Sequence, residues 1–133
     1  MGLFAATLGE QGARDIVTVE SDRRATEHAA ANLAEFDAQA VTGRVDRFLS
    51  GLPEGTRAGA VVLDPPRAGA GRVVVESIHA LDPEAVVYVA CDPVALARDL
   101  GTFRELGWQA ASLQAFDLFP HSHHFETVAL LTR

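Results

Sequence analysis

The sequence contains no lysine, only one cysteine and no long apolar run. A single cysteine cannot form a disulfide within the chain, nor a cysteine-based metal or iron–sulfur site. No apolar run approaches the ~20 residues that span a bilayer. No basic stretch followed by an apolar one opens the sequence, so we expect no secretory signal. These absences predict a cytoplasmic protein that does not enter a membrane.

Basic charge is also scarce. Eleven arginines are outnumbered by 18 acidic residues, which gives a formal net charge of −7. Proteins that bind nucleic acid on their own are usually basic, because neutralising phosphates supplies most of their affinity. We therefore expect that this chain does not hold RNA or DNA by bulk electrostatics. It can still act on a nucleic acid that another domain or a partner delivers.

The composition is that of a folded domain, with 133 residues, 48% hydrophobic and 22% charged. The length predicts one domain over residues 1–133. Strand-like and helix-like segments alternate, which predicts an α/β fold with a mostly parallel sheet. The expected strands are 15–20, 38–43, 58–63, 85–90, 108–116 and 125–131, and the expected helices are 21–36 (with Ser21 as N-cap), 72–81 and 93–106.

Ligands of parallel α/β sheets bind beyond the carboxyl ends of the strands. Three features of this sequence lie at the carboxyl ends of predicted strands: Glu20, the Asp-Pro-Pro turn of residues 64–66, and Cys91. Glu126 instead lies at the start of the last strand. It joins the same edge only if that strand runs antiparallel to the others, which is a prediction that the structure tests.

Gly2 and Glu20 have the spacing of a nucleoside site. A glycine before a helical run lets a ligand approach the backbone, and an acid about 20 residues later binds the ribose hydroxyls. Glu20 follows Gly2 by 18 residues. Only one glycine of the G-x-G pattern is present, so the alternative is that Glu20 is a surface acid at the end of a strand.

Asp64 directly follows a buried strand, and the two prolines after it restrict the backbone. A carboxylate held at the edge of a sheet can accept a hydrogen bond or a proton from a cofactor or a base. The alternative is a rigid turn that only ends the strand.

Cys91 ends a strand and precedes a helix that Asp92 can cap and Pro93 can begin. The N-terminus of a helix favours the thiolate, which is the reactive form of cysteine. From the residues alone, two interpretations stay open: a nucleophile, and an ordinary buried cysteine.

Three histidines and a glutamate lie together in residues 121–126. These residue types can bind a metal, but their spacing matches no zinc pattern, so we expect no metal. The alternative is a polar loop that presents Glu126 as a general base at the sheet edge.

Together these segments resemble the catalytic domain of the RNA (uracil-5-)-methyltransferase family, enzymes that act on tRNA or 23S ribosomal RNA with S-adenosylmethionine. The resemblance covers essentially the whole chain. It is carried by Gly2-Leu3-Phe4-Ala5, Val19-Glu20, Leu63-Asp64-Pro65-Pro66-Arg67-Ala68-Gly69, residues 87–93 with Leu96-Ala97-Arg98-Asp99-Leu100, and residues 116–121 through 126–128.

The resemblance implies a class I methyltransferase fold, Rossmann-like and with an antiparallel last strand. It also implies a reaction. The cysteine matched by Cys91 adds to C6 of uracil, so that C5 becomes electron-rich and takes the methyl group, and the base matched by Glu126 removes the C5 proton. Glu20 matches the acid on the cofactor ribose, and Asp64 matches an acid of the cofactor and active-site region. The uridine is implied to flip out of its stack.

The sequence departs from the family pattern at three places. Asp92 stands where asparagine is common, and its charge disfavours a thiolate unless Asp92 is turned away to cap the helix. Many members have an aspartate soon after the third strand, whereas this segment reads Gly43-Arg44-Val45-Asp46, so Asp46 is the candidate for the contact with adenine. The family's first strand, central in its sheet, and its RNA-binding parts precede residue 1. We therefore expect a partial catalytic domain, from a truncation or a misassigned start, with RNA delivered by the missing parts.

Two other functions stay open. The chain can be an inactive remnant or an interaction fragment of such an enzyme, which a test of cofactor binding distinguishes. Amino-methyltransferases also carry an acid-Pro-Pro motif, but there an aromatic residue usually follows the prolines, whereas Arg67 follows here. They also need no cysteine.

Overall fold

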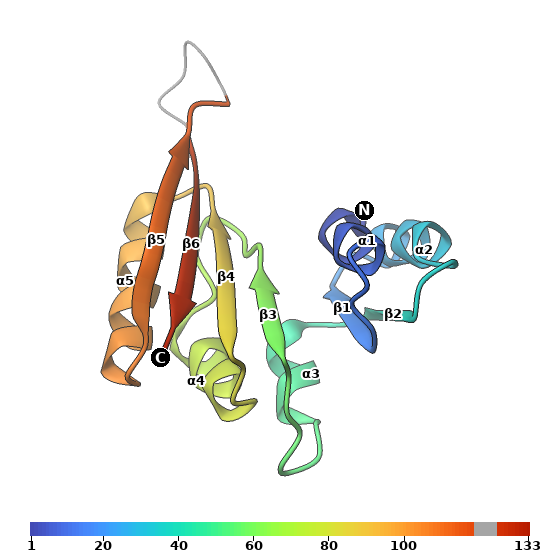
Figure 1. Cartoon of the computed structure of the whole chain (residues 1–133), viewed down its shortest axis with the longest axis horizontal. Coiled ribbons are helices and arrows are strands. Elements are labelled where there is room, and N and C mark those ends of the chain that lie inside the picture. The colour runs from blue at the N-terminus through green and yellow to red at the C-terminus, as the bar shows by residue number, and fades with distance from the viewer. Residues whose placement is uncertain (119–124) are drawn as a thin grey trace. The chain divides into compact units, whose positions relative to one another are not determined.

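In a computed structural model of the chain, which describes residues 1–118 and 125–133, two compact units form, Met1–Leu52 and Pro53–Arg133 (Figure 1). Helices and strands alternate along most of the chain, so the predicted α/β class is confirmed. None of the helices in the described ranges has the length and hydropathy needed to cross a bilayer.

The first unit is built on a two-stranded parallel sheet. Its elements in chain order are α1 (Leu3–Glu10), β1 (Ile16–Glu20), α2 (Arg23–Asn32), β2 (Ala38–Thr42) and α3 (Val45–Ser50). β1 pairs with β2 along its whole length, with Ile16 opposite Ala38. Both longer helices contribute to a small core, in which Ala5 of α1 packs with Ala29 of α2 and the adjoining Leu33. Most of the side chains buried in this unit are therefore small.

α2 is shorter than predicted at both ends. Its N-cap is Asp22, whose carboxylate accepts a hydrogen bond from the Ala25 N–H at 2.8 Å. The prediction of Ser21 as the cap is wrong, and the Ser21 hydroxyl instead donates to the Glu20 carboxylate at 3.2 Å. The short helix α3 was not predicted, because six residues are too few to show a helical period.

The second unit contains a four-stranded sheet in the order β3-β4-β6-β5. Its elements are β3 (Ala60–Leu63), α4 (Arg72–Ala80), β4 (Ala85–Ala90), α5 (Pro93–Glu105), β5 (Gln109–Phe116) and β6 (Glu126–Thr132). β3 and β4 are parallel, whereas β6 is antiparallel to both of its neighbours, β4 and β5. Among the described strands of this sheet, β6 alone is reversed, as predicted for the last strand.

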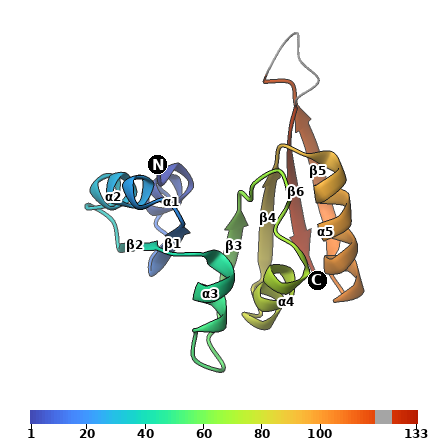
Figure 2. The same cartoon turned by 180° about the vertical axis from the view of Figure 1, so that it is seen from behind.

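α4 and α5 cover the same face of this sheet (Figures 1 and 2). The core beneath them is made of large side chains, including Tyr88 of β4 and Phe103 of α5, which are almost fully buried. Gly107, at φ 90°, ends α5 and directs the chain into β5. The neighbouring Trp108 packs edge to face on Phe103, with ring centroids 6.0 Å apart.

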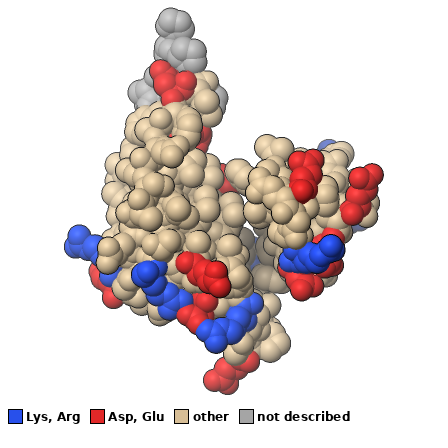
Figure 3. Space-filling view, in the orientation of Figure 1, with Lys and Arg blue, Asp and Glu red and all other residues tan. Residues whose placement is uncertain are grey.

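The edge strand β5 is exposed along all eight residues and contains no charged residue. In the view of Figure 3 the surface of this unit is largely uncharged, and its arginines gather at the lower end beside acidic side chains. On this face the positive charges of the unit are therefore interleaved with negative ones.

Candidate active site

Cys91 and Glu126 lie at the same edge of the second unit's sheet. β4 and β6 pair antiparallel with Ala90 opposite Thr127, and these two residues directly adjoin Cys91 and Glu126. Cys91 and Glu126 are both half-buried. The predicted antiparallel direction of β6 thus brings Glu126 to the carboxyl end of β4.

Asp64 lies at the same edge, directly after β3, the strand that pairs parallel with β4. Leu63, the last residue of β3, pairs with Tyr88, so Asp64 leaves its strand close to the level at which β4 ends. Asp64 is exposed and Leu63 is buried. The strand register therefore places Cys91, Asp64 and Glu126 at one edge of one sheet, where ligands of α/β proteins bind.

The residue after Cys91 caps the helix that follows. Asp92 is the N-cap of α5, its carboxylate accepts a hydrogen bond from the Ala95 N–H at 2.8 Å, and Pro93 occupies the first turn. The prediction that Asp92 caps is confirmed. The Asp92 carboxylate is hydrogen-bonded to the backbone of α5. This is the capping arrangement in which, as expected from the sequence, the charge of Asp92 is compatible with a thiolate at Cys91.

The loop of residues 64–71, which connects β3 to α4 and is called the β3–α4 loop below, is held by a buried carboxylate. Asp99 of α5 is 1% exposed. Its Oδ2 accepts hydrogen bonds from the Tyr88 hydroxyl at 2.6 Å and from the N–H groups of Ala70 at 2.7 Å and Gly71 at 3.3 Å. Its Oδ1 accepts from the Arg98 guanidinium at 3.0 and 3.2 Å.

These contacts shift two pKa values. Burial opposes ionisation of Asp99, but the donors from Tyr88, Gly71, Arg98 and Ala70 outweigh it and hold the pKa of this carboxyl below its ordinary value. Burial, followed by the hydrogen bond to Asp99, raises the pKa of the Tyr88 phenol above its ordinary value. Asp99 is therefore a carboxylate and Tyr88 a neutral phenol at neutral pH.

Asp99 and Tyr88 were not predicted as site residues, although the sequence carries a signal for Asp99. Leu96, Asp99 and Phe103 share one helical stripe, and all three are buried. An acid on the apolar stripe of a helix is costly unless it has partners. That pattern indicates a buried polar contact, but not which loop supplies the donors.

The other predicted site residues belong to the first unit. Glu20 ends β1, half-buried, and its Oε1 accepts hydrogen bonds from the Ser21 hydroxyl and from the Asp22 N–H at 3.0 Å. Thr42, the last residue of β2, pairs with Glu20, so the segment that leads to Asp46 starts at the same edge.

Asp46 lies in the first turn of α3 and pairs with Arg44, with N–O distances of 2.9 and 3.1 Å. The hydrogen bond from the Arg44 guanidinium lowers the pKa of the Asp46 carboxyl from its ordinary value. Asp46 is therefore an ionised acceptor that already has a cationic partner.

Gly2 precedes α1 with φ 80°, in the left-handed region that favours glycine. A Cβ at this position would lie 3.3 Å from the Cβ of Ala29. Gly2 therefore lets α1 begin close against α2, and this packing role stands beside the predicted approach of a ligand.

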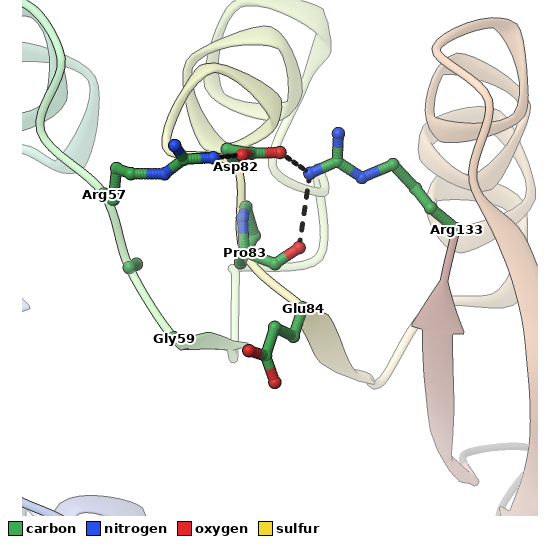
Figure 4. Close-up of a pocket in the computed structure, with 7 residues that line it drawn as sticks. Arg57, Gly59, Asp82, Pro83, Glu84 and Arg133 are labelled. Carbon is green, nitrogen blue, oxygen red and sulfur yellow. Dashed lines mark hydrogen bonds and ion pairs between the residues drawn. The ribbon is translucent and has the colours of Figure 1, made fainter.

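A hollow at the opposite edge of the second unit's sheet was not predicted. It is lined by Arg57, Ala58, Gly59, Asp82, Pro83, Glu84 and Arg133. The Asp82 carboxylate lies between Arg57 and Arg133 and pairs with both (Figure 4). Since these opposite charges are partnered within the chain, the hollow has the features of a structural ion-pair cluster.

The histidines of residues 121–124 lie outside the described residues. Within the described part of the chain, no group of three or more His, Cys, Asp and Glu side chains could hold a metal ion.

Comparisons with known proteins point to one family. The sequence profile of the tRNA (Uracil-5-)-methyltransferase family matches residues 33–133. A Streptomyces avermitilis protein described as an uncharacterized RNA methyltransferase is 47% identical over 138 residues, which cover 98% of this chain and 31% of that protein. A Streptomyces coelicolor protein with the same description is 46% identical, over 98% of this chain and 29% of that protein.

A solved structure is also similar. The tRNA (uracil-54, C5)-methyltransferase of Pyrococcus abyssi, in complex with S-adenosyl-L-homocysteine, matches 97% of this chain and 31% of its own, with a TM-score of 0.82 and 29% identity. The expected Rossmann-like methyltransferase fold is thereby confirmed. The chain spans only about a third of the length of these proteins.

Proposed function

This chain belongs to the tRNA (uracil-5-)-methyltransferase family, and from that premise we propose that it is a catalytic part of an enzyme that methylates C5 of a uridine in tRNA or ribosomal RNA. The observation that carries the proposal is the pairing of β4 with β6, which places Cys91 and Glu126 at one edge of the sheet together with Asp64. A nucleophile and a base at one strand end are what this reaction needs.

The acids of the chain suit S-adenosylmethionine as the methyl donor. Both described hydrogen bonds of the Glu20 carboxylate go to Oε1, which leaves Oε2 to accept from ribose hydroxyls. We propose that Gly2 lies beside the cofactor, that Asp46 accepts from the adenine amine, and that Asp64 lies near the cationic sulfonium. When bound, this cofactor supplies an electrophilic methyl group and leaves as a neutral thioether.

The residues of the second unit would then act in sequence. The Cys91 thiolate adds to C6 of uracil, a C–S bond forms, and the C5–C6 π electrons move toward the O4 carbonyl to give an enolate. C5 of that enolate takes the methyl group. Glu126 removes the C5 proton, the electron pair restores the C5–C6 double bond, and the C6–S bond breaks to return the thiolate. The uridine has to leave its stack to reach Cys91.

We propose that the RNA is held by parts of a longer protein. The net charge of −7 and the interleaved charges of Figure 3 favour this, because binding by phosphate neutralisation needs an excess of cations. A profile match that runs from the first unit through the second supports one catalytic domain made of both. Because the substrate is an RNA, the cytoplasm is the compartment that we propose.

Covalent trapping tests the proposal. A short RNA that contains 5-fluorouridine is incubated with the chain and S-adenosylmethionine, at an RNA concentration high enough to replace delivery by the parts proposed to hold it, and intact-protein mass spectrometry detects the adduct. Fluorine at C5 cannot leave as a proton does, so the wild-type adduct should accumulate, whereas Cys91→Ala should form none. With ordinary uridine RNA, Glu126→Gln should accumulate a methylated adduct, because no base removes the C5 proton.

The outcomes separate the alternatives. Methylation that persists in Cys91→Ala would contradict the covalent mechanism and favour chemistry at an exocyclic amine. A wild-type chain that binds no S-adenosylhomocysteine and forms no adduct would support an inactive remnant.

A further inference from the structure

The Asp99 carboxylate is unusual among the acids of this chain, because it is buried in the middle of a helix and carries five hydrogen bonds. Three of its donors, the Tyr88 hydroxyl and the N–H groups of Ala70 and Gly71, converge on a single oxygen. Taking a carboxylate out of water is costly unless such donors replace the water. Two of these donors belong to the β3–α4 loop, so the carboxylate fastens that loop to α5.

The β3–α4 loop is held at a second point by the same helix. The Arg98 guanidinium donates to the Ala68 carbonyl at 2.6 Å and also pairs with Asp99 at 3.0 Å. Arg98 and Asp99 therefore bind a carbonyl and two amides of three neighbouring loop residues.

Gly69 shows how closely this loop approaches α5. A Cβ at this position would lie 2.5 Å from Oδ2 of Asp99, 2.6 Å from a guanidinium nitrogen of Arg98 and 3.2 Å from the Ala95 Cβ, and its φ is +79°. Only glycine fits this contact without displacing the two side chains that make it.

The elements that hold the loop also flank Cys91. Tyr88 precedes Cys91 by three residues on β4, and α5, which carries Asp99, begins two residues after Cys91. The loop itself begins with Asp64. The hydrogen bonds of Asp99 therefore connect the segment that carries Asp64 to both elements that flank Cys91.

We propose that Asp99 is a positioning residue, which holds the β3–α4 loop against α5 and so sets where Asp64 and Arg67 lie relative to Cys91. This inference rests on the proposed function. Asp99 does not touch the reacting atoms, and its effect passes through the loop backbone. Since a displacement of about 1 Å in a reacting geometry can cost about a hundredfold in rate, releasing the loop should slow chemistry more than binding.

The test uses the full chain and three variants. Asp99→Asn keeps the size of the side chain but loses its charge and one acceptor oxygen. Tyr88→Phe removes one donor and leaves the two backbone donors, so it tests the proposal if Asp99→Asn fails to fold. Glu105→Gln is the matched control, an exposed acid on the same helix whose partner is Arg72.

Two measurements are made on each variant. Amide hydrogen exchange reports on the N–H groups of Ala70 and Gly71. The rate of adduct formation with 5-fluorouridine RNA, measured over a range of RNA concentrations, separates the maximal rate from the half-saturating concentration. Urea unfolding at the same temperature establishes that each variant is folded.

For Asp99→Asn we expect exchange at both amides to rise about tenfold or more, and the maximal rate to fall about tenfold or more with little change in half-saturation. Tyr88→Phe should also raise the exchange rates and lower the maximal rate, but by less. Glu105→Gln should match wild type in both measurements. Faster loop exchange with an unchanged maximal rate would overturn the positioning role alone. A wild-type chain that forms no adduct even at the high RNA concentration that replaces delivery would overturn the proposed function and the positioning role with it.

Discussion

The first unit buries mainly alanines, whereas the second buries aromatic rings. Ala5 and Ala29 pack with Leu33 in the first, while Trp108, Tyr88 and Phe103 are among the largest buried side chains of the second. Apolar burial stabilises by roughly 25 cal/mol per Å², so the aromatic core positions of the second unit contribute more than the alanines of the first. The residues proposed for methyl transfer, Cys91 and Glu126, lie in the unit with the larger buried side chains.

This difference matches what the two sets of residues are proposed to do. A nucleophile and a base act only when they are held in one geometry. Cys91 and Glu126 lie at the ends of strands in the unit with the large-residue core, and the buried Asp99 binds the loop that begins with Asp64. The proposed nucleoside contacts, Glu20 and Asp46, are acids near the surface of the first unit. The structural support of the proposed chemistry is therefore concentrated in residues 53–133.

Removing one large core residue from each unit gives the largest expected effect. Trp108→Ala loses its edge-to-face contact with Phe103 and the hydrogen bond from its indole N–H to His79, and should cost about 4 kcal/mol. Leu33→Ala should lower the free energy of unfolding by about 3 kcal/mol, less than Trp108→Ala, because fewer large side chains surround the cavity that it leaves. Urea unfolding measures both values.

Hydrogen exchange then locates each effect. Leu33→Ala should speed exchange in α2 and β1 and leave β4 and β6 close to wild type, and Trp108→Ala should do the reverse. Equal acceleration through both units in either variant would show that the two cores unfold together, and would contradict the comparison.

Lowering the pH should weaken the hydrogen bonds between the Asp99 carboxylate and the β3–α4 loop. Because the folded-state pKa of Asp99 is lowered, its contribution to stability is present above the ordinary pKa of about 3.9 and is lost as pH falls through the folded value. The free energy of unfolding of wild type minus that of Asp99→Asn should be constant from pH 5 to 7, on the order of 2 kcal/mol. It should shrink below about pH 4.

Urea unfolding from pH 3 to 7 checks this difference. Asp46→Asn serves as the control from the first unit, since its partner Arg44 is exposed and screened by solvent. A wild-type advantage over Asp99→Asn that does not change with pH would show that the carboxylate charge contributes nothing to holding the loop.

The helix caps give the smallest expected effect, and they should act alike in both units. Asp22→Ala and Asp92→Ala each remove a carboxylate that accepts from a backbone N–H at 2.8 Å, and each should cost about 1 kcal/mol. Ser21→Ala is the matched control and should change stability by less than about 0.5 kcal/mol. If Ser21→Ala destabilised as much as Asp22→Ala, the assignment of the cap to Asp22 would be wrong.

Much of the fold could be predicted because local patterns are strong in this sequence. The strand at residues 85–90 was predicted with the observed bounds, and α5 was predicted from its Asp92 cap to its Gly107 stop. Ser21 and Asp22 are both good caps, so local preference alone could not choose between them. That choice depended on the neighbouring Glu20, which binds the Ser21 hydroxyl.

Part of the candidate site could not be predicted from local patterns. Asp99 follows Ala70 by 29 residues, and its hydrogen bonds exist only because α5 packs beside the β3–α4 loop. The sequence shows an acid on an apolar helical stripe. It does not show the donors that neutralise the cost of burying that acid.

The sequence by itself determined most of the strands and helices, because turns, caps and apolar runs depend on near neighbours, although it did not reveal α3 or choose between Ser21 and Asp22 as a cap. Only the tertiary structure decided that β6 runs antiparallel beside β4, which brings Glu126 to the end of the strand that precedes Cys91. Strand pairing over such a distance depends on which faces are buried together and on how the whole chain closes. That information belongs to the packed sheet and to no single segment of it.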